Sequence, residues 1–211
     1  MTPKIIPVTL VTLMLAACNS QKDASNATFA NALEKHLAGP GSCITIKPFV
    51  SAADRQSYPM TVTLFVKKGW DSQSVVDQNN AIMTRQLDPL VKAGVLSVAP
   101  GKNSEAAPAR IYSLTDAGQK AIESADSTAM CVGHYKVDEV ASFTQPETVN
   151  GQTTSRVIFT ASPVDVPDWA KRQDVQNAYS GLADALAPQI KSARTLVLAS
   201  DGWIDAAEFR Q

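Results

Sequence analysis

The amino-acid sequence predicts a protein of the α+β class, in which helices and strands are interspersed along the chain. Apolar residues recur at helical spacing in several segments, for example in Thr28 to Ala38. Other segments alternate apolar and polar side chains, for example Met60 to Lys67, which is typical of a half-buried strand. Turn residues separate the two kinds of segment and set the bounds of each predicted element.

The first half of the chain is predicted to begin with a helix that ends at the turn residues Gly39-Pro40-Gly41. A second, long amphipathic helix is expected to end at Gly94, and Thr115 is predicted to cap a third helix with its hydroxyl group. The elements expected in order are a helix over 28–38, strands over 43–47 and 60–67, a helix over 74–93, strands over 95–98 and 111–114 around a polar loop, and a helix over 116–124.

The second half is predicted to start with a long strand from Cys131 that bends near Asp138-Glu139. The pair Asn150-Gly151 is typical of a tight hairpin turn and joins this strand to the next. Asp168 is predicted to cap the helix that follows. The remaining elements are a strand over 153–162, helical stretches over 169–179 and 182–190, a strand over 195–199 and a turn at 201–202 that leads into a short final strand.

One stretch of the first half, about 74–124, resembles the winged-helix domains. The resemblance rests on the run from Leu87 to Leu96, the polar hairpin tip after it, and the run from Tyr112 to Gly118. It implies a winged-helix-like N-terminal subdomain whose helix and wing face DNA in that family. The positions that match the DNA-facing surface are Gln78, Asn79, Arg85, Gln86, Lys102 and Arg110.

The fold of the second half is left open between two interpretations. Both halves share an order of strand with Cys, hairpin return, Trp near a helix start, apolar helix, strand and Asp turn, which indicates a degenerate duplication. Alternatively, two long strands followed by a helix and further strands resemble the curved sheet of cystatin-like proteins. Either way, the second half is expected to form a second α+β subdomain.

The N-terminal residues have the features of an export signal. Lys4 precedes an apolar run from Ile5 to Ala17, which is too short to span a membrane because a spanning helix needs about 20 residues. Leu15-Ala16-Ala17-Cys18 resembles the lipobox of bacterial lipoproteins, and the resemblance implies cleavage before Cys18 and attachment of fatty acyl chains, palmitate among them, to Cys18. An ordinary cleaved signal or a buried helix is the alternative.

These features predict the location and the division of the chain. Asn19, where a retained inner-membrane lipoprotein has Asp, favours the inner leaflet of the outer membrane, facing the periplasm. The expected segments are a signal peptide over 1–17, the lipidated Cys and a flexible tether over 18–27, the first subdomain over 28–126 and the second over 127–211.

Charge and location together argue against nucleic acid as a partner. Removing residues 1–17 removes Lys4, so 19 basic and 20 acidic side chains become 18 and 20, a net charge of 18 − 20 = −2. Binding to DNA or RNA requires a basic patch that releases counterions. We therefore expect no nucleic-acid partner despite the winged-helix resemblance.

The remaining cysteines predict a disulfide bond. Cys43 and Cys131 form an even pair in a compartment where disulfides persist. The bond would close a loop of nearly ninety residues and stabilise the fold by roughly 4 kcal/mol. A redox-active site would need a Cys-x-x-Cys motif, and a metal site is not expected because His36 and His134, the only histidines, do not lie at ligand spacing from a cysteine.

The sequence contains no pattern that predicts a catalytic residue or a cofactor site. Carboxylates that could form a hydrolytic pair, Asp138, Glu139, Asp165 and Asp168, fit equally well as exposed strand and cap residues. Three tryptophans at turns, Trp70, Trp169 and Trp203, could form a binding surface, although packing in the core is the simpler interpretation.

The function expected from these observations is binding without catalysis. The chain is predicted to be a lipid-anchored envelope lipoprotein that holds another envelope protein, a peptide or a small ligand. A small envelope hydrolase and a protective, immunity-type lipoprotein are the alternatives. The membrane is an expected partner through the lipid on Cys18.

Overall fold

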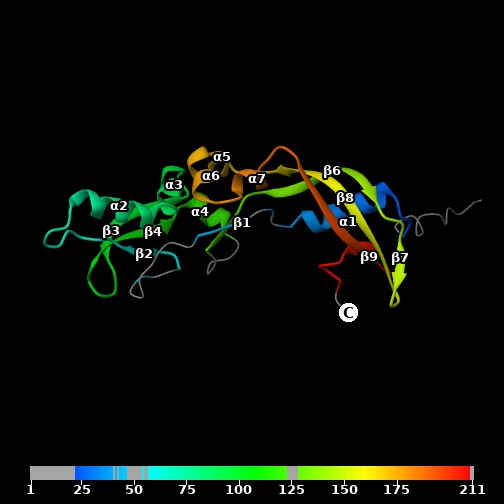
Figure 1. The fold of residues 1–211 in the computed structure, drawn as a ribbon, viewed down its shortest axis with the longest axis horizontal. Helices are drawn as coiled ribbons and strands as arrows, with labels where there is room; N and C mark the ends of the chain where they lie inside the picture. The colour runs from blue at the N-terminus through cyan, green and yellow to red at the C-terminus, as the bar shows by residue number, and fades with distance from the viewer. Residues whose placement is uncertain are drawn as a thin grey trace, which may run out of the picture.

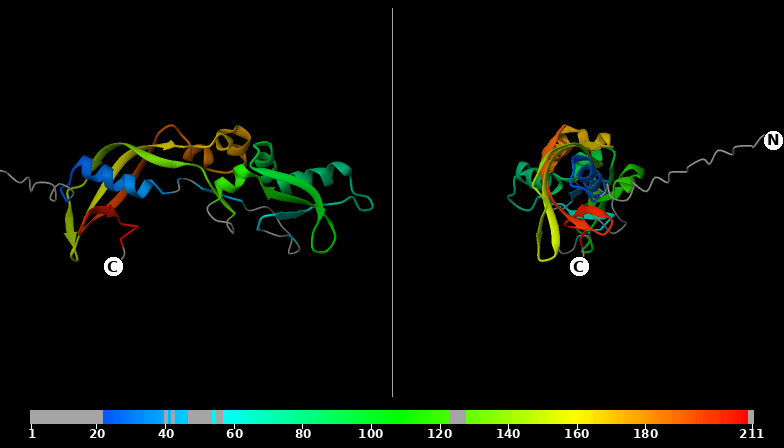
Figure 2. Two further views of the ribbon diagram at one scale, coloured as in Figure 1. Left: turned by 180° about the vertical axis from the view of Figure 1, so that it is seen from behind. Right: turned by 90° about the vertical axis from the view of Figure 1, so that its right-hand side faces the viewer.

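The computed structural model describes residues 22–39, 41, 43–46, 54, 57–122 and 128–209 of the 211-residue chain. It confirms the α+β class. The molecule is elongated, with one antiparallel sheet toward each end and short helices between them (Figure 1). Figure 2 shows the same two ends from behind and end-on. Within the described segments, no helix is long and apolar enough to cross a membrane.

One end of the molecule carries a small sheet and three helices (Figure 1). These elements are β2 (Met60–Thr63), α2 (Gln73–Thr84), α3 (Leu87–Lys92), β3 (Leu96–Lys102), β4 (Pro108–Leu114) and α4 (Asp116–Ala121). The strands form an antiparallel sheet in the order β2-β4-β3. The hydroxyl of Thr115 accepts a hydrogen bond from the backbone N–H of Gly118, which confirms the predicted cap of α4.

The single long helix predicted over 74–93 is wrong, because the structure divides it into α2 and α3. Pro89 explains the break. It has no N–H to donate, and in a continuous helix its ring would clash with the carbonyl of Arg85. At the junction the hydroxyl of Thr84 donates to Asp88 Oδ2 at 2.7 Å instead.

The other end of the molecule is a curled antiparallel sheet that forms half a barrel around α1 (Asn26–Leu37). Its strands are β6 (His134–Phe143), β7 (Glu147–Val149), β8 (Gln152–Val164), β9 (Ile190–Ala199) and β10 (Gly202–Asp205). They are ordered β10-β9-β8-β6, and β7 pairs with β8 beyond the end of β6. In the end-on view of Figure 2, α1 lies inside the arc of this sheet.

The predicted bend and hairpin turn of this sheet are confirmed, and the helix cap predicted after β8 is wrong. The register of β6 against β8 shifts between Val137 and Glu139, where the bend was expected. Asn150 and Gly151 both have the positive φ of a tight hairpin turn. Asp168, however, is the first residue of α5 (Asp168–Lys171) and not its cap, because Pro167 has the extended backbone of the cap position.

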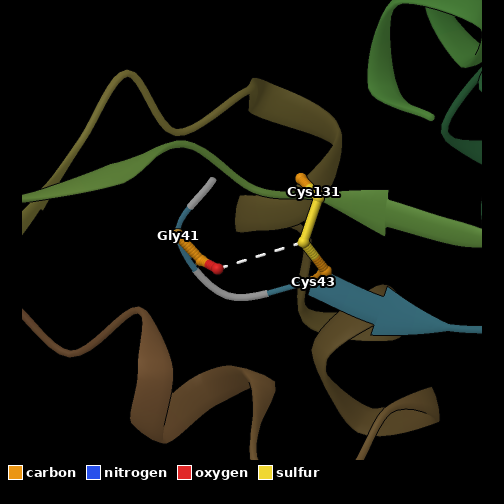
Figure 3. Close-up of a disulfide and its surroundings, with 3 residues drawn as sticks. All are labelled: Gly41, Cys43 and Cys131. Carbon is orange, nitrogen blue, oxygen red and sulfur yellow. Dashed lines mark hydrogen bonds between the residues drawn. A yellow bond between two sulfur atoms is a disulfide. The ribbon is translucent and has the colours of Figure 1, made fainter. Parts of the chain in front are cut away.

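Between the two ends lies a narrow segment that we call the waist. It contains β1 (Cys43–Thr45), which pairs with β5 (Ala129–Cys131), and the helices α5, α6 (Gln173–Ala178) and α7 (Leu182–Ala185). Cys43 lies opposite Cys131 in this pairing, and the two form the predicted disulfide bond (Figure 3). Beside it, the Gly41 N–H donates to the Gly133 carbonyl at 2.7 Å.

Two hydrophobic cores fill the two parts, and each draws residues from distant parts of the sequence. The first core surrounds Met60 and Tyr112 and is completed by Trp169 and Leu182 from the helices of the waist. The second core surrounds Phe29, whose ring packs edge-on against Phe143 and Trp203. The predicted division at 126/127 separates the two large sheets, whereas α1 and the helices α5 to α7 pack across it.

Candidate functional site

The three tryptophans predicted as a binding surface lie in three different places. Trp169 is 8% exposed in the first core, and Trp203 is 5% exposed in the second. Trp70 is fully exposed in the connection between β2 and α2. Cys18, the predicted lipidation site, lies outside the described residues. Of the three tryptophans, Trp70 alone has a side chain that a partner could reach.

The connection that carries Trp70 spans residues 64–72, and we call it the tip loop. It protrudes at the extreme end of the molecule, beyond the sheet formed by β2, β3 and β4 (Figure 1). The side chain of Asn80, on α2, holds its first residues. Asn80 Oδ1 accepts from the Phe65 N–H at 2.7 Å, and Asn80 Nδ2 donates to the Phe65 carbonyl at 3.0 Å. One carboxamide therefore satisfies both backbone groups of Phe65.

The far side of the tip loop is fixed by a turn from Lys68 to Asp71. The Asp71 N–H donates to the Lys68 carbonyl at 3.0 Å, and Asp71 Oδ2 accepts from the Lys68 N–H at 3.1 Å. Gly69, inside the turn, has φ of +53°, a conformation that strongly favours glycine. The backbone of the loop is thus held at both ends by specific hydrogen bonds.

The side chains of the tip loop, in contrast, pack on little of the protein. Phe65 is 51% exposed and Val66 is 44% exposed, in addition to the fully exposed Trp70. Lys67 and Lys68 are exposed between them, and neither forms an ion pair with another described residue. The arrangement presents apolar and cationic groups on a fixed backbone, which is the geometry of a pre-formed binding loop.

The sequence singled out Trp70 but missed Phe65 and Val66, which were assigned to a half-buried strand. That strand ends at Thr63 because its partner β4 begins at Pro108, which has no N–H with which to extend the ladder. The last contact is the Leu64 N–H, which donates to the Pro108 carbonyl at 2.8 Å. No signal within 60–67 marks this end, because it depends on where the distant partner strand begins.

Comparison with known protein families, with curated proteins and with solved structures finds no match to this chain. The tip loop is therefore defined as a candidate site by its own contacts and exposure.

A polar network joins α3 to the sheet behind the tip loop. Asp88 accepts hydrogen bonds from Arg110 at 3.1 Å and from the Tyr112 hydroxyl at 3.0 Å. Burial raises the pKa of Tyr112 to about 12. The pKa of Arg110 is raised as well, and the largest cause is the hydrogen bond between Arg110 and Tyr112. Arg110, a position that the winged-helix resemblance assigns to phosphate contact, is thus engaged within the protein.

The two histidines lie beside separate carboxylates. His36, at the end of α1, contacts Glu208 through Nδ1 at 2.7 Å and lies 3.8 Å from the buried Asp205 through Nε2. Arg194 is 3.9 Å from the same Asp205 oxygen, so this cluster fastens the C-terminal segment to α1. His134 lies 3.5 Å from Asp165. Among the described residues, no group of three or more His, Cys, Asp or Glu side chains could hold a metal ion.

The carboxylates considered for hydrolysis are all exposed. Asp138 accepts from the Ser162 hydroxyl at 2.7 Å, and Asp168 forms an ion pair with Lys171 at 3.0 Å. Cavities occur elsewhere. One of about 340 Å³ lies between α1 and the turn before β10, and one of about 390 Å³ lies beside the disulfide. Both are at the small end of the range for ligand pockets.

Proposed function

We propose that this chain is a lipid-anchored protein of the bacterial envelope that binds a second envelope component through its tip loop, without catalysing a reaction. The anchor is the fatty-acylated Cys18, and the folded body faces the periplasm from the outer membrane. The observation that carries the proposal is the tip loop, in which a fixed backbone presents exposed Phe65, Val66 and Trp70.

The position of the tip loop supports the proposal. The N-terminal segment leads into α1, which lies in the opposite part of the elongated body (Figure 1). Trp203 Nε1 donates to the Lys22 carbonyl at 3.1 Å, so the start of the described chain is held against the curled sheet. A protein anchored through that end would direct the tip loop away from its own membrane.

The waist supports the proposal as well, because close contacts hold the two ends of the molecule together. Gly41, between α1 and β1, is in backbone contact with Gly133, between β5 and β6. A Cβ atom at Gly41 would lie 2.6 Å from the Gly133 carbonyl oxygen. The disulfide between Cys43 and Cys131 joins the same two parts of the chain (Figure 3). A covalent bond and close backbone contacts therefore hold the waist, which lies between the anchored end and the tip loop.

The proposal also includes a finer assignment of the fold. The order α2, α3, β3, β4 and α4, with β2 beside β4, supports a winged-helix-like subdomain. The curled sheet around α1 supports the cystatin-like alternative for the second subdomain. The two large sheets differ in strand order, and the duplication stays a prediction.

Photo-crosslinking in intact cells tests the binding role. A photoreactive phenylalanine derivative is placed at position 70 of the full-length chain and, as a matched control, at Val149 on β7, which is also exposed and apolar but lies in the opposite part of the molecule. We expect an adduct from position 70 and none from position 149. A protective lipoprotein would give the same adduct with its target, whereas absence of any adduct at position 70 contradicts the proposal.

A separate substitution tests the anchor. Cys18→Ser removes the thiol that would receive the lipid, so we expect an unprocessed chain that takes up no radiolabelled fatty acid. Normal labelling of this variant would refute lipid attachment at Cys18.

A further inference from the structure

We propose that the surface bound by the tip loop is an anionic phospholipid bilayer, into whose headgroup region Trp70 and Phe65 insert. This inference rests on the proposed function, in which the tip loop is the binding site, and names the class of its partner. A protein anchored by lipid at one end would then touch a second lipid surface with the other.

The chemistry of the exposed side chains fits a bilayer interface. Tryptophan and phenylalanine rings partition into the boundary between headgroups and acyl chains. Lysine extends its apolar stem along such a surface and leaves its ammonium group among the phosphates. In the tip loop, Lys67 and Lys68 lie between Val66 and Trp70, so both kinds of group occur within six consecutive residues, Phe65 to Trp70.

The local charge favours an anionic surface. The tip loop contains Lys67, Lys68 and Asp71, a net charge of 2 − 1 = +1 on a protein that is acidic overall. Asp71 Oδ2 accepts a hydrogen bond from the Lys68 N–H and is turned toward the loop backbone. On α2, which packs behind the loop, the one carboxylate is Asp77, which accepts from Gln73 Nε2 at 2.8 Å. The two lysines are thus the groups free to meet phosphate.

Size and shape favour a fluid surface over a protein partner. A stable protein interface buries about 800 Å² on each partner. Phe65, Val66 and Trp70 supply about 500 Å² of apolar side chain at most, since an aromatic side chain buries roughly 150–250 Å² and Phe65 and Val66 are only 51% and 44% exposed. A bilayer needs no matching pocket and closes around a convex loop. The protrusion of the loop in Figure 1 suits insertion.

The test uses the chain from residue 18 onward with Cys18→Ser, which retains every described residue and carries no lipid. The probes are vesicles of phosphatidylethanolamine with phosphatidylglycerol, and neutral vesicles of phosphatidylcholine. We expect the protein to sediment with the anionic vesicles and its tryptophan emission to shift to shorter wavelength. That shift reports Trp70, because Trp169 and Trp203 are already buried.

Matched variants define the residues responsible. Trp70→Ala should lower the partition coefficient about tenfold, and the double variant Lys67→Gln/Lys68→Gln should lower it about thirtyfold on anionic vesicles only. Val149→Ala removes an exposed apolar side chain elsewhere and should bind as the unsubstituted protein does. Circular dichroism should be unchanged in all of these variants, since the Trp70 side chain packs on nothing.

The outcomes separate this inference from the proposed function. Failure of the protein to bind anionic vesicles, or equal binding by Trp70→Ala, overturns the bilayer as partner. If position 70 nevertheless crosslinks to a protein in cells, the proposed binding role stands with a protein as partner. If position 70 crosslinks to nothing and no vesicle is bound, both proposals fail.

Discussion

Gly133 lies where two connections of the waist touch. Its φ is +77°, and a Cβ atom at this position would lie 2.3 Å from the Val164 carbonyl oxygen. Gly133→Ala therefore combines backbone strain with a steric clash that the carbonyl cannot avoid. We expect it to lower the free energy of unfolding by about 3 kcal/mol in urea denaturation.

Gly151 provides the control for this prediction. Its φ is +79°, nearly the same, but no atom lies within 4 Å of the Cβ that a substitution would add. Gly151→Ala should therefore cost only the backbone strain, about 1 kcal/mol. Equal losses in the two variants would show that the waist is not closely packed at Gly133.

Tyr112 gives the stability a dependence on alkaline pH. Burial raises the pKa of its hydroxyl to about 12, whereas tyrosine in an unfolded chain titrates near about 10. Between these values the unfolded chain has lost a proton that the folded protein keeps, so stability falls as pH rises. Below pH of about 10 the contribution is constant.

Tyr112→Phe removes this part of the pH dependence. We expect urea midpoints of the variant, measured from pH of about 9 to about 12, to fall less steeply than those of the unsubstituted protein. Burial also raises the pKa values of Tyr58 and Tyr179, so part of the slope should persist. Identical slopes for both proteins would contradict a buried Tyr112 hydroxyl.

At the level of elements, the tip loop depends on the side chain of Asn80 on α2, which forms the hydrogen bonds to Phe65 that a partner strand would otherwise form. Asn80→Ala removes both hydrogen bonds to Phe65. We expect the Phe65 amide to exchange its hydrogen about tenfold faster, because each exposed hydrogen bond contributes only about 1 kcal/mol. Mass-spectrometric or NMR hydrogen exchange measures this directly.

Asn79→Ala is the matched control, since Asn79 is the same residue type on the same helix and forms no side-chain hydrogen bond with another described residue. It should leave exchange at Phe65 unchanged. If the two variants behave alike, Asn80 does not hold the loop.

The helices and strands also show how much of the fold could be predicted from the sequence. Local signals located most elements: the Thr115 cap, the Asn150-Gly151 turn and the bend near Glu139 all depend on residues close in sequence. The break between α2 and α3 could have been predicted from Pro89. The extent of β2 could not, because it depends on where the partner strand β4 begins.

The candidate site was predicted only in part for a similar reason. Trp70 was recognised as a turn residue, but burial of Trp169 and Trp203 depends on cores assembled from distant segments. Exposure of Phe65 follows from the end of β2 at Thr63 and from the side chain of Asn80, fifteen residues further along the chain. A pattern in one segment cannot reveal either contact.

At the level of the whole molecule, the disulfide between Cys43 and Cys131 closes a loop with a sequence separation of 88 residues. Cross-linking so long a loop stabilises a fold by roughly 4 kcal/mol. The double variant Cys43→Ala/Cys131→Ala should lose about that much in urea denaturation, and reductant should have no further effect on it. Equal stability of the oxidised protein and the variant would contradict this contribution.

The interleaved cores determine how much of the chain is needed before each core can be completed. Phe29 belongs to the same core as Trp203, and Met60 belongs to the same core as Leu182, so each core includes residues that are far apart in the sequence. Neither core can therefore be completed until the chain as far as Leu182 and Trp203 is available. The topology therefore sets the order in which the cores are completed: the core around Phe29 of α1 is closed by Trp203 of β10, the last strand.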